Sequence, residues 1–345
     1  MYARGVTRYA WALGIVVWLG CGAASEQSPV DASTGASTST TSTTLDPSSS
    51  STSSTSTAGG TSVGTSSSSG GADAGSTSST GSPSASSSGG DASSTGVWPE
   101  GSAGCGLDPE IPEDFWVLQE TEADGVARDY YVRLPENYKR NRPYPVIYQF
   151  HGCFSGDNRW QNNHPIHAAA GRDAIVVRGV AIEDCWDFSG QGSAVALFDV
   201  MVEEVESRFC ADDARRFASG YSSGAFVSHQ LSCRRGDMLR GVATLGGGVL
   251  GTDCTGQTAA YVVHDVGDPV VPIVHGRNGR NGNLERNACE LSTLPFDPDP
   301  CVEYEGCDPG FDVVWCQTEG FGHGRRDDYA APAFWAFFDA LEPLR

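Results

Sequence analysis

Two pentapeptides in the chain have the form Gly-x-Ser-x-Gly, a pattern that can present a serine hydroxyl as a nucleophile. One is Gly-Tyr-Ser-Ser-Gly at residues 220–224, which follows an apolar stretch and precedes a helix-compatible one. The other, Gly-Thr-Ser-Val-Gly at 60–64, lies in a low-complexity tract with neither flank. Because the motif needs a strand before it and a helix after it to expose the serine, we predict that Ser222 is catalytic and that Ser62 is not.

A serine hydroxyl becomes nucleophilic when a base takes its proton and an acid orients that base. Downstream, Asp268 lies in a Gly-Asp-Pro turn beyond an expected strand, and His323 lies in a loop with glycine on both sides. Asp265 is the alternative acid, and we favour Asp268 because its turn lies in the loop past the strand end. The order Ser, Asp, His is the one found in α/β-hydrolases. It predicts a triad of Ser222, Asp268 and His323.

Acyl transfer also needs hydrogen-bond donors for the oxyanion that forms on the attacked carbonyl. The first predicted donor is the backbone amide of Ser223, the residue after the nucleophile. The second should come from a His-Gly-Cys-Phe segment, where we predict Cys153, with Phe154 as the alternative. Aromatic side chains near the predicted loops could pack against a flat substrate ring, and we predict Trp186 and Tyr221 for that contact.

Strand-like and helix-like segments alternate along the part of the chain that carries these residues. The apolar run at 174–182 is typical of a strand buried on both faces of a sheet. Residues 193–210 change to a helical period, with acidic side chains opposite the apolar face. This alternation predicts an α/β fold, a mostly parallel central sheet flanked by helices, with the chemistry at the carboxyl ends of the strands. The other predicted strands are 127–134, 144–150, 216–220, 239–245, 259–264 and 311–316, and the other predicted helices are 223–235 and 331–341.

The N-terminal part of the chain has a different composition. Residues 1–24 carry two arginines, an apolar run and then small residues, the pattern of a secretory signal peptide that is too short to span a membrane. Cys21 ends a stretch that resembles a bacterial lipobox, which predicts its lipidation; ordinary cleavage near residue 24 is the alternative. Residues 22–97 are mostly Ser, Thr, Gly and Ala and are predicted to be a disordered tether. We expect an exported protein, extracellular or on the outer cell surface, with its folded domain at 98–345.

Cysteine content and charge narrow the class of that domain. Ten of the eleven cysteines lie in it, and an even number in an exported chain predicts disulfides, although the spacing leaves their pairing open. No Cys-x-x-Cys or His-x-x-x-His pair is present, so no metal site is predicted. The triad chemistry requires no cofactor. The formal net charge of −21 includes −3 on residues 1–97, which leaves −18 on the domain and makes nucleic acid an unlikely partner. The oligomeric state stays open.

Taken together and in order, the motifs resemble those of a family of secreted α/β-hydrolase esterases that includes feruloyl esterases and polyhydroxybutyrate depolymerases. The cysteine-rich segments are similar to the feruloyl-esterase-like branch in particular. The resemblance covers about residues 105–341. The motifs that carry it are His151-Gly152, Gly220-Tyr221-Ser222-Ser223-Gly224, His264-Asp265-Val266-Gly267-Asp268, Gly320-Phe321-Gly322-His323, Gly104-Cys105-Gly106, the segment from Pro300 to Cys307, and Val314-Trp315-Cys316.

The resemblance implies a serine carboxylesterase that hydrolyses ester bonds of plant cell-wall polysaccharide, either feruloyl or acetyl xylan esters. Two alternatives remain at this point. One is a depolymerase of polyhydroxybutyrate or another polyester. The other is a surface-displayed binding module on a hydrolase fold, although no member of the triad is missing here.

Overall fold

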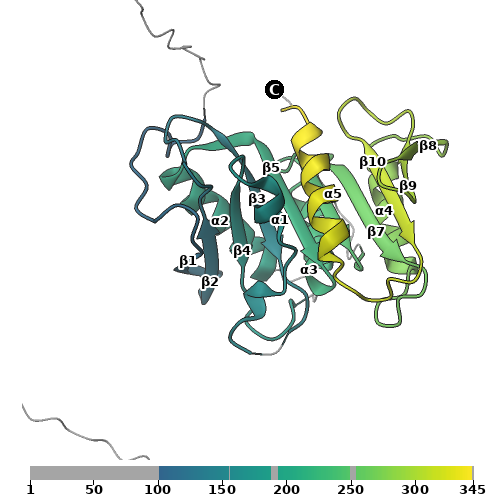
Figure 1. Ribbon diagram of the computed structural model, residues 1–345, viewed down its shortest axis with the longest axis horizontal. Helices are drawn as coiled ribbons and strands as arrows, with labels where there is room; N and C mark the ends of the chain where they lie inside the picture. Colours follow the sequence, from purple (N-terminus) through teal and green to yellow (C-terminus); the bar gives the residue numbers. More distant parts are fainter. Residues whose placement is uncertain (1–100, 155, 188–192, 249–253, 344–345) are drawn as a thin grey trace, which may run out of the picture. The chain divides into compact units, whose positions relative to one another are not determined.

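The computed structural model describes residues 101–154, 156–187, 193–248 and 254–343 (Figure 1). All of them belong to one compact unit, Ser88–Arg345. The predicted signal peptide, the lipidation at Cys21 and the tether at 22–97 lie outside the described residues. No helix within the described ranges is both long enough and apolar enough to cross a membrane.

A ten-stranded sheet forms the centre of the fold, in the order β1-β2-β4-β3-β5-β6-β7-β10-β9-β8. The six strands from β4 to β10 in this order are parallel to their neighbours, and antiparallel strands extend the sheet at both edges. The predicted α/β fold with a mostly parallel sheet is therefore confirmed. The strands are β1 (Val117–Ala123), β2 (Val126–Arg133), β3 (Tyr144–Phe150), β4 (Ile175–Gly179), β5 (Ala211–Tyr221), β6 (Gly241–Leu245), β7 (Ala259–Asp265), β8 (Thr293–Phe296), β9 (Cys301–Tyr304) and β10 (Val313–Thr318).

Helices cover both faces of the sheet, and successive side chains of a strand point to opposite faces. Phe217 of β5 packs in the core with Phe338 of α5, whereas its neighbour Ala218 belongs to the core on the other face, with α2 and α3. Helix α5 crosses the front of the sheet in Figure 1, beside α1. The helices are α1 (Ile166–Ala170), α2 (Ser193–Arg208), α3 (Ser223–Arg234), α4 (Val274–Arg286) and α5 (Asp327–Ala340), with a short 3-10 helix at Arg159–Gln161.

The segment between β7 and β10, for which no helix or strand was predicted, contains α4, β8 and β9. Helix α4 has few large apolar residues and packs instead through glycine. A Cβ on Gly276 would lie 2.4 Å from Nδ1 of His264, and one on Gly279 would lie 2.5 Å from Cε1 of His229. A search for apolar side chains at helical spacing does not detect a helix whose contact face is glycine.

Five disulfides brace the domain and use all ten of its cysteines. The prediction of disulfides is confirmed, and the pairing that the spacing left open is now known. Cys301 and Cys316 are register partners on β9 and β10, and their bridge ties the antiparallel edge to the parallel block. The remaining pairs are Cys105–Cys210, Cys153–Cys185, Cys233–Cys254 and Cys289–Cys307.

Candidate active site

Ser222 lies at the turn between β5 and α3, as the motif predicts. Its backbone has φ 54° and ψ −119°, a conformation that side-chain-bearing residues rarely adopt. Both glycines of the motif are required by sterics: a Cβ on Gly220 would lie 2.2 Å from the carbonyl oxygen of Gly224, and one on Gly224 would lie 1.8 Å from that of Phe150. The Gly-x-Ser-x-Gly pattern therefore allows β5, α3 and β3 to approach closely enough to hold the serine in this turn.

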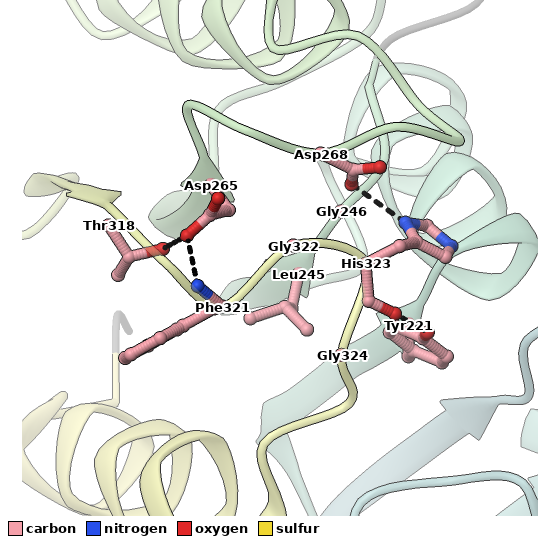
Figure 2. Close-up of a pocket in the computed structure, with 10 residues that line it drawn as sticks. All are labelled: Tyr221, Leu245, Gly246, Asp265, Asp268, Thr318, Phe321, Gly322, His323 and Gly324. Atoms are coloured by element: carbon pink, nitrogen blue, oxygen red, sulfur yellow. Dashed lines mark hydrogen bonds and ion pairs between the residues drawn. The ribbon is translucent and has the colours of Figure 1, made fainter.

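The three side chains predicted as a triad form a continuous hydrogen-bonded chain. Ser222 Oγ lies 2.9 Å from His323 Nε2, and His323 Nδ1 lies 2.7 Å from Asp268 Oδ2 (Figure 2 shows the second contact). The other oxygen of Asp268 accepts hydrogen bonds from the backbone N–H groups of Val270 and Val271, both at 2.8 Å. A carboxylate accepts hydrogen bonds, so His323 Nδ1 is the donor in its contact with Asp268, and Nε2 faces the serine hydroxyl.

Asp265, the alternative acid, has a different task in the structure. Its Oδ2 accepts hydrogen bonds from the Phe321 amide at 2.8 Å and from the Thr318 hydroxyl at 3.1 Å, and its Oδ1 accepts one from the Gly267 amide at 2.9 Å. Burial alone would raise the pKa of Asp265, but these donors outweigh it and the pKa is lowered. Figure 2 shows Asp265 turned toward β10 and away from His323. It anchors the loop that carries His323.

Two further side chains hold the His323 loop and the Asp268 loop. The Tyr221 hydroxyl donates a hydrogen bond to the carbonyl oxygen of His323. His264 is fully buried, and its Nε2 donates to the carbonyl oxygen of Val271 at 2.8 Å, 3.6 Å from Asp268 Oδ2. Burial lowers the pKa of His264, which favours the neutral ring. His264, near the end of β7, thus holds the loop of Asp268 through Val271.

His151 sets the direction of the peptide that carries the Cys153 amide. Its Nδ1 donates to the carbonyl oxygen of Gly152 at 2.7 Å, and its Nε2 accepts from the Ala181 amide at 3.1 Å. Since the carbonyl and N–H of a trans peptide point in opposite directions, the Cys153 amide points away from His151. No described residue accepts a hydrogen bond from it. Burial is the main cause that lowers the pKa of His151 to about 4, so the ring is neutral.

Two of the predicted site residues are placed elsewhere. The Phe154 amide, predicted as an alternative oxyanion donor, donates to the carbonyl oxygen of Asp184 at 2.9 Å, which engages it in the loop structure. Trp186, predicted to touch substrate, is only 3% exposed, and its indole N–H donates to the carbonyl oxygen of His151. Its ring packs edge-on against Phe150, so this prediction is wrong. Large aromatics fill cores as readily as they line sites, so the residue type alone does not separate the two roles.

A cleft of ≈ 510 Å³ opens above Ser222 and His323. Tyr221, which was predicted to contact the substrate, lines this cleft. Its wall also contains residues that the sequence reasoning missed. For Val270 and Arg325 the only signal was proximity to a predicted residue, since they lie two positions beyond Asp268 and His323, and Asn162 had no such signal. The remaining lining residues are Cys153, Asn162, Val270 and Arg325.

Sequence similarity to other proteins identifies the family of the chain. Feruloyl esterase D of Neurospora crassa is 30% identical over 264 residues, which cover 69% of this chain and 89% of that protein. Feruloyl esterase C of Emericella nidulans is 30% identical over 265 residues, covering 71% of this chain and 94% of that protein. The chain belongs to the feruloyl esterase family. As a feruloyl esterase-like protein it is a carboxylic ester hydrolase, and the resemblance drawn from the motifs is confirmed.

Two further comparisons concern one segment of the sequence and the fold. The family model described as "Putative esterase" matches residues 123–192, a stretch that includes β3 and the segment of Cys153. The acetyl xylan esterase from Aspergillus awamori shares the fold, with a TM-score of 0.50 over 64% of this chain and 99% of that chain, at 14% identity.

Within the described ranges, no group of three or more His, Cys, Asp or Glu side chains is arranged to hold a metal ion.

Proposed function

We propose that this feruloyl esterase-like chain is an exported serine carboxylesterase and that Ser222, His323 and Asp268 are its catalytic triad. The observation that carries the proposal is the chain of two hydrogen bonds, at 2.9 and 2.7 Å, that joins the three side chains beside an open cleft. The strained backbone of Ser222 adds to it, because such conformations persist where the surrounding structure over-determines them, often at functional sites.

The chemistry follows from the hydrogen bonds. Ser222 Oγ attacks the ester carbonyl carbon while His323 Nε2 takes its proton, and Asp268 stabilises the imidazolium that results. The negative charge that develops on the carbonyl oxygen is met by the N–H groups of Ser223 and Cys153. When the intermediate collapses, His323 returns the proton to the leaving alkoxide. Water, deprotonated in turn by His323, then attacks the acyl-enzyme carbonyl, and His323 returns that proton to Ser222 Oγ as the acid is released.

The substrate that we propose is a feruloyl or acetyl ester of a plant cell-wall polysaccharide. The support is the similarity of the chain to relatives named feruloyl esterase, which it matches over most of their length. The cleft is compatible with a flat acyl group, since Tyr221 and an exposed Val270 both line it. The net charge of −18 on residues 98–345 places no penalty on a neutral ester of this kind.

Export is the second part of the proposal. Five disulfides are typical of proteins that fold outside the reducing cytosol. A signal peptide at 1–24 would carry the chain out, and a lipid on Cys21 with a tether at 22–97 would hold the esterase domain, residues 98–345, at the outer cell surface. Partition of the mature protein into detergent, together with the mass of its N-terminal peptide, separates lipidation from ordinary cleavage.

The test of the activity uses Ser222→Ala on a panel of methyl ferulate, acetylated xylan and hydroxybutyrate oligomers. We expect the wild type to hydrolyse the first or second of these, and the variant to lose at least roughly 10⁴-fold in kcat with unchanged thermal unfolding. Preferential turnover of hydroxybutyrate would instead identify a polyester depolymerase. Binding to polysaccharide without hydrolysis of any ester would identify a binding module.

A further inference from the structure

Asn162 holds the backbone of the oxyanion loop, residues 151–154, at two points. Its carbonyl oxygen accepts a hydrogen bond from the Gly152 amide at 3.1 Å, and its Nδ2 donates to the carbonyl oxygen of Cys153 at 3.3 Å. The loop also packs closely here, since a Cβ on Gly152 would lie 2.7 Å from Tyr221 Cδ1 and 3.1 Å from Asn162 Nδ2. Asn162 thus fixes the backbone on both sides of the Cys153 N–H.

Arg325 determines which way the side-chain amide of Asn162 faces. Its Nη1 donates to Asn162 Oδ1 at 3.3 Å and to the carbonyl oxygen of Gln161 at 3.2 Å. Because a guanidinium group has donors and no acceptor, the amide oxygen of Asn162 must face Arg325. The NH₂ group then faces the other way, toward the carbonyl oxygen of Cys153. A flipped amide would bring two oxygen atoms together at Cys153 and lose that hydrogen bond.

Asp327 holds Arg325 in turn. Arg325 Nη2 donates to Asp327 Oδ2 at 2.6 Å, and Asp327 is the first residue of α5. The other oxygen of Asp327 lies 3.5 Å from Nδ1 of the buried His164. Burial alone would raise the pKa of Asp327, but its contacts with His164 and Arg325 outweigh burial, and the pKa is lowered. An ionised carboxylate on a helix therefore anchors the guanidinium at the wall of the cleft, which Arg325 lines.

Arg325 also belongs to the His323 loop, since it follows His323 by two residues. It therefore connects this loop with the oxyanion loop. Both loops must hold their positions at the same moment, because the Cys153 N–H meets the charge on the carbonyl oxygen while His323 takes the serine proton. We propose that Arg325 is a positioning residue that acts through Asn162 to hold the Cys153 amide at the oxyanion. The inference rests on the proposed function of Ser222 and adds to it the residue that couples the two loops.

The experiment measures kcat and KM separately for Arg325→Met, Asn162→Ala and the double variant, on the ester that the wild type hydrolyses fastest. Loss of an oxyanion donor costs roughly 10²- to 10³-fold in kcat. We expect a displaced donor to cost less, so Arg325→Met should lower kcat by about 10- to 100-fold and leave KM within about twofold. Asn162→Ala should lower kcat at least as much. Because Arg325 acts through Asn162, the double variant should match Asn162→Ala within about twofold.

Arg326→Met is the matched control, because Arg326 lies in the same loop but donates to both carboxylate oxygens of Asp328, at 3.0 and 2.9 Å. It should change kcat by less than about threefold. Thermal unfolding verifies that each variant is folded. If Arg325→Met does not fold, Arg325→Lys takes its place. An ammonium group lacks the fork that reaches Asn162 and Asp327 together, so we expect a loss of about 3- to 10-fold in kcat that disappears when Asn162→Ala is also present.

Four results would overturn the inference. An unchanged kcat would show that Arg325 positions nothing, and an increase in KM alone would make it a substrate-binding residue. Losses that multiply in the double variant would show that Arg325 does not act through Asn162. Equal losses for Arg325→Met and Arg326→Met would show only that the loop tolerates no substitution. If the wild type hydrolyses no ester, or Ser222→Ala is as active as the wild type, the proposed function itself fails, which is distinct from all four.

Discussion

Replacing Asp268 with Asn tests the direction of the hydrogen bonds in the triad. In the wild type, Asp268 Oδ1 accepts from two backbone N–H groups at 2.8 Å and Oδ2 accepts from His323 Nδ1 at 2.7 Å. An Asn side chain has one acceptor oxygen, and that oxygen will face the two N–H groups, because the reverse rotamer would point an NH₂ group at both donors. The NH₂ group then faces His323 Nδ1 and forces the ring proton onto Nε2.

In that tautomer His323 cannot accept the proton of Ser222. We expect Asp268→Asn to lower kcat by roughly 10⁴-fold, which corresponds to about 5.5 kcal/mol of transition-state stabilisation. The assay is initial-rate hydrolysis of methyl ferulate at pH 7, with circular dichroism to verify the fold. Asp265→Asn is the matched control, and because Asp265 holds the loop through Phe321 rather than contacting His323, its loss in kcat should stay within about tenfold. A loss in kcat below tenfold for Asp268→Asn, or a loss above tenfold for Asp265→Asn, would refute this assignment.

The remaining predictions concern the frame around the triad. Gly224→Ala places a Cβ 1.8 Å from the Phe150 carbonyl oxygen, so we expect no folded protein, and a soluble active variant on size-exclusion chromatography would contradict the steric argument. Cys185→Ser opens the disulfide next to the Cys153 amide, and Cys254→Ser opens the one at Cys233; the sequence separations of 32 and 21 predict similar stability losses of about 3–4 kcal/mol. Only Cys185→Ser should also lower kcat, by roughly 10²-fold if the oxyanion donor is displaced, and equal kcat values for the two would rule out that link. Burial lowers the pKa of His151 to about 4, so its ring stays neutral in the native protein, whereas in the unfolded chain the ring takes up a proton below about pH 6.5. The free energy of unfolding should therefore be unaffected by this group above pH 6.5 and decline by up to about 3 kcal/mol as the pH falls toward 4, and urea titrations that show no decline over this window would contradict it.

The site was predictable from sequence where chemistry and chain order constrain it. Ser222 is constrained by glycines that only a tight turn requires, and Asp268 and His323 follow it in order at the ends of strands. The structure brings these three side chains into hydrogen-bonding contact. The prediction that Trp186 contacts substrate is wrong because nothing in the local sequence separates an aromatic residue on the surface of a loop from one that turns inward. The burial of Trp186 depends on its packing against Phe150 of β3.

The prediction of the fold succeeded where apolar periodicity is strong and failed where other interactions position the chain. The apolar strands of the parallel block and the amphipathic α2 were located to within a few residues. The edge strand β1 was missed because its sequence, VLQETEA, places polar Gln119 and Thr121 on its less exposed side and apolar Leu118 on its exposed side, so the usual alternation is absent. Helix α4 was missed because glycine forms its contact face. Asn162 shows a limit of a different kind, since it joins Gly152, Cys153 and Arg325 through hydrogen bonds whose partners lie far apart in the sequence.

The two edge strands of the sheet have a consequence for the behaviour of the protein at high concentration. An unpaired edge can recruit a strand from another molecule and start aggregation. On β1 the exposed side carries Glu120 and Glu122, so two copies that meet along this edge bring like charges together. On β8, Pro295 lacks the N–H that a new strand would need. Both ends of the sheet thus resist intermolecular extension, which keeps folded molecules from pairing edge to edge at high concentration.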